Sequence, residues 1–192
     1  MSTVFGRGIG LVLLLVASVL MSTGSRAEPI GGPFALTGPD GRVVRDSDYR
    51  GQWLLVYFGY ISCPDVCPTD LQRISDAMAA LGPAAERIVP LFITLDPRRD
   101  TPERLADHVK LFHPRMVGLA GTEAEIDEVA KRYRVRFLRN PPDKNGFYGV
   151  DHTTNIYLVA PNGRFVEWYK MAVPGSGIAE AVRRQMARAQ RE

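Results

Sequence analysis

The sequence predicts an α/β domain in which helices flank a central mixed sheet. Two nearly continuous apolar runs, at residues 52–60 and 88–95, are typical of strands that are buried on both faces. A segment with helical periodicity lies between them, which is the order of a parallel β-α-β unit. Two further runs flank a Pro-Asn-Gly turn at residues 161–163 and predict an antiparallel hairpin.

Length and composition are those of a globular protein. The chain has 192 residues, of which 45% are hydrophobic and 23% are charged. This balance excludes collagen-like, mucin-like and highly charged disordered chains. The formal net charge of +3 raises the question of nucleic-acid binding, but residues 1–27 contain two arginines and no acidic residue. The rest of the chain has no basic stripe that would neutralise many phosphates, so we expect no nucleic-acid partner.

Residues 1–27 are predicted to be a targeting segment that lies outside the fold. Arg7 precedes an apolar run at residues 9–21, and small residues follow that run. This pattern is typical of a cleaved signal peptide. The run is shorter than the about 20 residues of most membrane spans, but with its flanks, at residues 8–24, it leaves an uncleaved membrane anchor open. We therefore expect residues 28–192 to form an exported domain, either periplasmic or anchored to the inner membrane and facing the periplasm.

The predicted domain begins with a hairpin extension. Residues 34–37 and 42–44 have extended character, and a Gly-Pro-Asp-Gly turn joins them. Between the two buried strands, apolar residues recur at helical spacing over residues 71–81. Pro68 fits the first turn of a helix but not its interior, so this helix is predicted to begin near Pro68.

The C-terminal half contains shorter elements. Thr101 before a proline and the Thr122/Glu125 capping box each predict a helix start. The expected elements are a helix over residues 102–112, a strand over 117–119, a helix over 122–133, an extended segment over 135–138, a loop over 140–149, strands over 153–159 and 165–171, and a helix over 178–189. A β-α-β crossover followed by two strands and a helix is the plan of a thioredoxin-like domain.

Cys63 and Cys67 are the only cysteines, and they follow directly after the first buried strand. Functional sites of α/β sheets form beyond the carboxyl ends of the strands. The amide donors and the dipole at the start of a helix also stabilise a thiolate. Two cysteines separated by three residues in a turn can form a disulfide or bind one metal ion. A purely structural disulfide is the alternative, but a core of this size does not need one, so we favour a chemical role.

Three histidines are available as partners for the cysteines. His108 and His113 lie near the end of a predicted surface helix, where we expect exposure to solvent or a position at the helix terminus. His152 follows the loop at residues 140–149 and is expected to open the strand at residues 153–159. A lone histidine at the start of a strand is more often structural, so its position alone does not make it a ligand.

Four segments carry a more specific signal. They are YFGYISCPDVCPT at residues 57–69, ITLDPRRDT at residues 93–101, VGLAGT at residues 117–122, and VDHTT at residues 150–154 followed by YLVAPNG at residues 157–163. In this order they resemble the Sco/SenC family of copper-binding proteins, which is named for its role in the synthesis of cytochrome c oxidase. The resemblance implies a thioredoxin-like fold and places the family's metal ligands at Cys63, Cys67 and His152.

The implied cofactor is copper. Two thiolates and one imidazole suit Cu(I), and the imidazole helps to accommodate Cu(II), although zinc would tolerate the same residues. Asp96 and Asp100 are expected near the same rim, but we interpret them as charges at a helix N-terminus rather than as ligands. Asp151 is expected to point away from His152, because neighbouring strand residues face opposite sides.

The implied function is that of a copper metallochaperone rather than an enzyme, with a thiol–disulfide reductase activity left open. It would pass Cu(I) or Cu(II) to the copper-centre subunit of cytochrome c oxidase, with other copper chaperones or thiol reductants as further partners. The alternative is a thiol–disulfide oxidoreductase in which Cys63 and Cys67 reduce the cysteines of the oxidase copper site. A dithiol reductant does not need His152, so this residue favours metal binding. A thiol peroxidase is disfavoured because Tyr60 and Pro64 stand where such enzymes have threonine.

Overall fold

The structure, a computed structural model, describes residues 29–191. The targeting segment expected at residues 1–27 lies outside the described residues. Within the described part of the chain, no helix is both long enough and apolar enough to cross a membrane.

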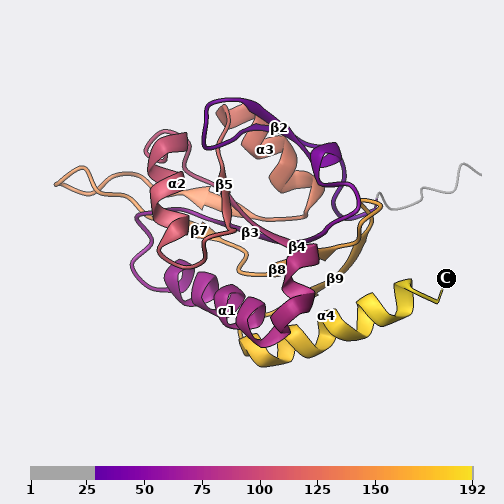
Figure 1. Cartoon of the computed structure of the whole chain (residues 1–192). Coiled ribbons are helices and arrows are strands. Elements are labelled where there is room, and N and C mark those ends of the chain that lie inside the picture. Colours follow the sequence, from indigo (N-terminus) through magenta and orange to yellow (C-terminus); the bar gives the residue numbers. More distant parts are fainter. Residues whose placement is uncertain (1–28, 192) are drawn as a thin grey trace, which may run out of the picture.

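A five-stranded mixed sheet forms the centre of the fold (Figure 1). Its spatial order is β5 (Val117–Leu119), β4 (Ile88–Thr94), β3 (Trp53–Gly59), β8 (Ile156–Val159) and β9 (Phe165–Tyr169). The first three are parallel to one another, whereas β8 is antiparallel to β3 and β9 is antiparallel to β8. Every residue of β3 and β4 is buried, as their continuous apolar sequences predict. The predicted mixed sheet is therefore confirmed.

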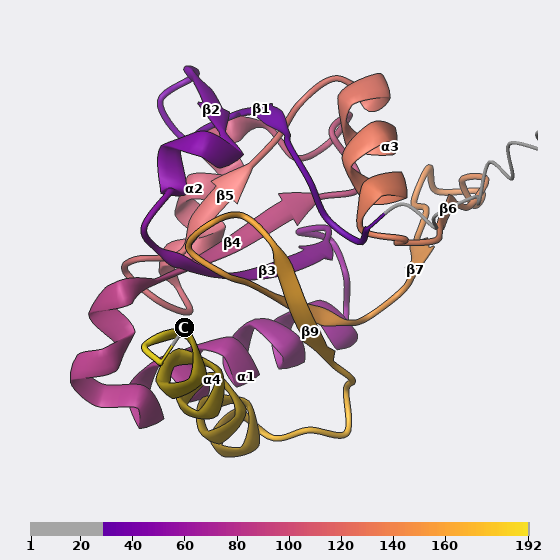
Figure 2. The same cartoon turned by 90° about the vertical axis from the view of Figure 1, so that its right-hand side faces the viewer.

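Helices cover both faces of this sheet, as Figure 1 and Figure 2 show. On one face, α1 (Val66–Leu81) packs along α4 (Gly175–Ala189). The other face carries α3 (Glu123–Arg132) and the predicted N-terminal hairpin of β1 (Ala35–Thr37) and β2 (Val43–Arg45). The connection between β4 and β5 is α2 (Pro102–Lys110), which packs beside β5. This arrangement is the predicted thioredoxin-like fold.

The predicted helix starts are close to the observed ones. Thr101 accepts a hydrogen bond from the backbone N–H of Arg104, and Thr122 forms the expected capping box with Glu125. The helix α1 begins at Val66, slightly earlier than predicted, so Pro68 lies in the first turn. There a proline removes no hydrogen bond of the helix, because the first amides have no partner within it.

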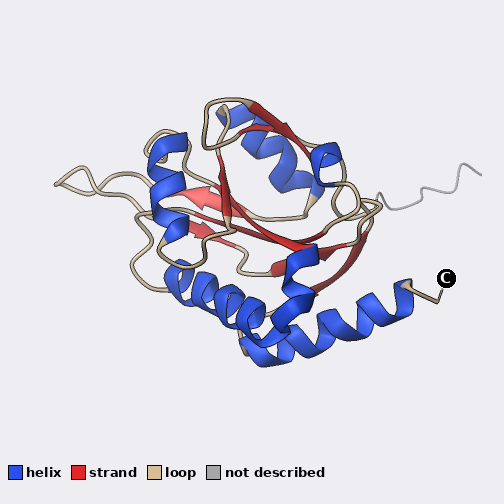
Figure 3. Cartoon of the chain, in the orientation of Figure 1, coloured by secondary structure: helices blue, strands red, loops and turns tan. Residues whose placement is uncertain are grey.

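The strand predicted at residues 153–159 is present but begins later than predicted, and His152 belongs to a different strand. The strand β7 (Val150–His152) ends at His152 and pairs with β6 (Phe137–Arg139) in a separate two-stranded sheet, and β8 begins only at Ile156. The backbone N–H of Thr153 donates to the carbonyl of Arg136, so the chain leaves β7 on the side of β6. His152 therefore closes one strand instead of opening the next. Figure 3 shows the long loop between β6 and β7 projecting from the body of the protein.

Candidate metal centre

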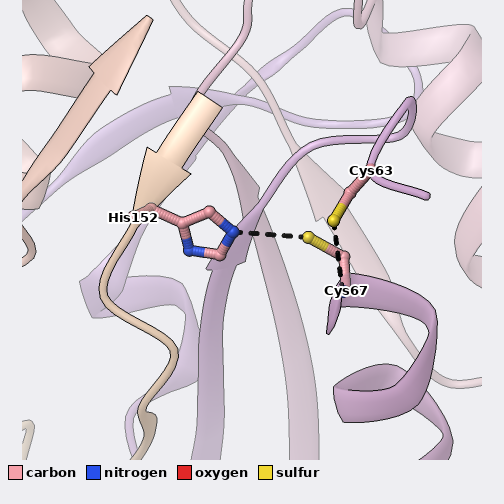
Figure 4. Close-up of side chains that lie close together, drawn as sticks. All are labelled: Cys63, Cys67 and His152. Atoms are coloured by element: carbon pink, nitrogen blue, oxygen red, sulfur yellow. Dashed lines mark hydrogen bonds between the residues drawn. The ribbon is translucent and has the colours of Figure 1, made fainter. Parts of the chain in front are cut away.

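The structure brings Cys63, Cys67 and His152 together at one end of the central sheet (Figure 4). Cys63 lies in the turn after β3, Cys67 lies in the first turn of α1, and His152 is the last residue of β7. The two sulfurs and one imidazole nitrogen all lie within 4.8 Å of one another. Cys67 and His152 are separated by 85 positions in the sequence, yet Sγ of Cys67 is 3.4 Å from Nε2 of His152.

Cys63 is the more accessible of the two thiols. Its side chain is partly exposed, and its sulfur accepts a hydrogen bond of 3.4 Å from the backbone N–H of Cys67. Burial opposes ionisation of this thiol, but the backbone amides of Asp65, Cys67 and Val66 outweigh it and hold the pKa of Cys63 below its usual value. The start of α1 thus stabilises the Cys63 thiolate, as expected from the sequence.

Cys67 is fully buried, and its sulfur lies directly against β3. Burial raises the pKa of its thiol. A Cβ atom on Gly59 would lie 2.9 Å from the Cys67 sulfur and 2.9 Å from Cε2 of Phe92. Only glycine allows the strand to approach the sulfur this closely, so Gly59 is part of the site although sequence reasoning missed it.

His152 is held in one orientation and one protonation form. Its Nδ1 lies 3.0 Å from the carbonyl oxygen of Thr153, which can only accept, so Nδ1 carries the proton. Nε2 is then left with a lone pair directed at the Cys67 sulfur, which is the arrangement that a metal-binding histidine needs. The rings of Tyr57 and Tyr60 lie edge-on to the imidazole. Burial lowers the pKa of His152, which favours the neutral ring.

Asp100 directly precedes the N-cap of α2, as expected, but Asp96 and Asp100 are both fully buried and their carboxylates bond to other groups than the amides of that helix. Asp100 accepts hydrogen bonds from the Ile61 backbone N–H (3.0 Å) and the Thr94 hydroxyl (2.7 Å). Asp96 pairs with Arg99 and accepts a 2.7 Å hydrogen bond from the Tyr148 hydroxyl. Neither belongs to the cluster of Cys63, Cys67 and His152. In the sequence, only their place in the ITLDPRRDT segment indicated that these two carboxylates lie near the site.

The remaining candidates lie away from the cluster. Asp151 is exposed, as expected for a side chain on the face of β7 opposite His152. His108 is near the end of α2 as predicted, but it is half-buried between Phe92 and Phe112 instead of solvated. His113 lies beyond that helix, and its Nδ1 accepts a hydrogen bond from the backbone N–H of Arg115.

Comparison with known proteins then identifies the family. The family model described as SCO1/SenC matches residues 22–187 of the chain. The chain belongs to the SCO1/SenC family. Its curated SCO1/SenC relatives include the mitochondrial SCO1 homolog of Homo sapiens, which is 45% identical over 142 residues. That match covers 73% of this chain and 47% of the human protein, so the chain spans only about half the length of that relative.

Solved structures of Sco proteins have the same fold. The chain has 35% sequence identity and a TM-score of 0.77 to Arabidopsis thaliana ScoI with copper bound, covering 83% of this chain and 99% of that one. It has 41% identity and a TM-score of 0.74 to Bradyrhizobium japonicum ScoI with copper bound, covering 81% of this chain and 98% of that one. The resemblance to the SCO1/SenC family and the predicted fold are therefore confirmed.

Proposed function

We propose that the protein binds one copper ion through Cys63, Cys67 and His152 and delivers it to the copper-centre subunit of cytochrome c oxidase. The observation that carries this proposal is the convergence of two sulfurs and one imidazole nitrogen within 4.8 Å. Soft thiolate ligands suit Cu(I), and the imidazole extends the set to Cu(II). The two ScoI relatives with copper bound support the choice of metal.

The donor set also suits release of the metal. Three protein ligands leave a coordination position open, through which an acceptor's ligands can enter. Cys63 is partly exposed, whereas Cys67 is buried, so an incoming ligand has access from the side of Cys63. Copper outcompetes zinc among divalent ions at such a site, and zinc is bound only where copper is scarce.

The delivery partner and the location of the protein are part of the proposal. The family resemblance supports cytochrome c oxidase as the recipient, with other copper chaperones or thiol reductants as suppliers of metal or electrons. The pattern in residues 1–27 supports export, with residues 28–192 as the copper-binding domain in the periplasm, either free or attached to the inner membrane.

A thiol–disulfide oxidoreductase is the second candidate, and the state of Cys63 favours it. Both cysteines are free, and the partly exposed Cys63 has a lowered pKa, as an attacking thiol requires. In this reaction, Cys63 attacks a disulfide of the target, and Cys67 then displaces the reduced target as an internal disulfide forms. The two electrons and the two protons of the cysteine thiols pass to the target.

Genetic complementation distinguishes the two functions. In a strain that lacks the gene, the activity of a copper-containing oxidase should fall and added copper should partly restore it. The His152→Ala variant keeps both thiols but loses the imidazole, so it should fail to restore oxidase activity when copper is scarce. His113→Ala is the matched control and should restore it fully. Full restoration by His152→Ala would favour the oxidoreductase.

A further inference from the structure

Two buried polar atoms next to Cys67 have no hydrogen-bond partner among the described residues. They are the hydroxyl of Tyr57 and Oδ2 of Asp70. Buried polar groups in native proteins are nearly always hydrogen-bonded, because an unpaired one costs about 1–3 kcal/mol. Two of them close to one metal-binding sulfur call for a functional explanation.

The carboxylate of Asp70 is held in a fixed position. Asp70 follows Cys67 by three positions in α1, so both side chains lie on the same face of the helix. Its Oδ1 forms an ion pair with Arg73, and Arg73 in turn donates to the carbonyls of Lys170 (2.7 Å) and Val173 (2.8 Å). The guanidinium compensates the charge of the carboxylate, and Oδ2 stays buried without a hydrogen-bond partner among the described residues.

The ring of Tyr57 lies beside the metal-binding residues. It is fully buried, is stacked on Phe92 and is edge-on to His152 at 6.2 Å between ring centroids. A Cβ atom on Gly59 would lie 2.9 Å from the Cys67 sulfur and 3.1 Å from Cε1 of Tyr57, so the sulfur and the ring border the same small space. A tyrosine hydroxyl carries its proton at neutral pH, so it can donate a hydrogen bond to the sulfur.

We propose that Tyr57 is a positioning residue whose hydroxyl, which lies near the Asp70–Arg73 ion pair, donates a hydrogen bond to the sulfur of Cys67 when that sulfur is a thiolate ligand. Cys67 is buried, so its negative charge needs donors from within the protein. The backbone N–H of Tyr60 is one such donor, and the Tyr57 hydroxyl would be a second. His152 does not supply one, because the nitrogen that faces the sulfur carries no proton.

The hydrogen bond would tune the metal site. It withdraws electron density from the sulfur, which lowers the energy of the sulfur lone pairs and favours the reduced metal. The inference rests on the proposed function, because it takes Cys67 as a copper ligand. It goes further because it assigns the contacts on the buried side of Cys67 to residues that do not bind the metal themselves.

Tyr57→Phe tests the proposal in the full protein loaded with Cu(II). The change removes only the hydroxyl, so the thiolate-to-Cu(II) charge-transfer band should move to longer wavelength. Tyr133→Phe is the matched control, because Tyr133 is also buried but packs against Phe58 and Tyr157 on the other face of the sheet. A band that stays at the wild-type position in Tyr57→Phe overturns the proposal. Absence of any thiolate band in the wild type would instead contradict copper binding itself.

A measurement on the metal-free protein distinguishes failure of this proposal from failure of copper binding. In a double-mutant cycle of Tyr57→Phe with Cys67→Ala, the unfolding equilibrium constants in urea should deviate from additivity by at least about twofold, because contacting groups are coupled. Effects that are simply additive would show that the hydroxyl does not interact with the sulfur. In that case Tyr57→Phe removes only an unpaired hydroxyl and should leave stability unchanged or higher.

Discussion

The carboxylate of Asp100 accepts a hydrogen bond of 3.0 Å from the backbone N–H of Ile61, across 39 positions of the sequence. The contact joins the loop after β4 to the turn that leads into Cys63. The same carboxylate oxygen accepts from the Thr94 hydroxyl, so the turn is tied to the end of the neighbouring strand. Asp100 therefore fixes the turn that carries Cys63, a proposed metal ligand, without being a ligand itself.

Replacement of Asp100 should weaken both the fold and the metal site. Asp100→Ala leaves the Ile61 amide and the Thr94 hydroxyl without their acceptor, which should lower the free energy of unfolding by about 1–3 kcal/mol. Copper affinity should fall as well, because the turn that carries Cys63 is released. Urea denaturation and competition with a chelator measure the two effects. Asp151→Ala, at an exposed position of β7, should change stability by less than about 0.5 kcal/mol. Equal stability and equal copper affinity of Asp100→Ala and Asp151→Ala would argue against this role of Asp100.

Substitution of Gly59 should disturb the site through steric overlap alone. In Gly59→Ala the added methyl group meets Cys67 and Phe92 at 2.9 Å, so the sulfur must shift. Overpacking of this kind costs about 1–3 kcal/mol, which thermal or urea unfolding would detect. Gly149→Ala is the matched control, because its nearest contact would be an ordinary 3.6 Å. Wild-type stability and an unchanged metal spectrum in Gly59→Ala would show that the strand does not restrict the sulfur.

The two thiols should react at different rates in the reduced, metal-free protein. Cys63 is partly exposed and has a lowered pKa, whereas Cys67 is buried and has a raised pKa. Because the thiolate is the reactive form, iodoacetamide at neutral pH should modify Cys63 first. As the pH rises, the rate at Cys63 should increase with a midpoint below the pKa of a free cysteine. Mass spectrometry of the labelled peptides measures this order, and faster labelling of Cys67 would contradict it.

The elements that the sequence predicts best are those with long, unambiguous patterns. The apolar runs of β3 and β4 and the capping box of Thr122 and Glu125 each have a single local explanation. The break before β8 was missed because β6 and β7 are only 3 residues each, too short to show a period. Their pairing depends on a contact across the long loop, which no local pattern encodes.

The site was predictable to different degrees. The spacing of Cys63 and Cys67 after a buried strand indicates a reactive pair without further knowledge. His152 joined them only through the family resemblance, because 85 positions separate it from Cys67. The buried roles of Asp100 and Gly59 depend on which loops and side chains meet at the end of the sheet, so the sequence alone could not show them.

X-ray absorption spectroscopy of the Cu(I)-loaded protein tests the proposed ligand set most directly. With Cys63, Cys67 and His152 as ligands, the fine structure beyond the copper absorption edge should show two sulfur neighbours and one imidazole nitrogen. The imidazole signal should disappear in His152→Ala and remain in His113→Ala. A spectrum without sulfur neighbours, or one that His152→Ala leaves unchanged, would contradict this copper site.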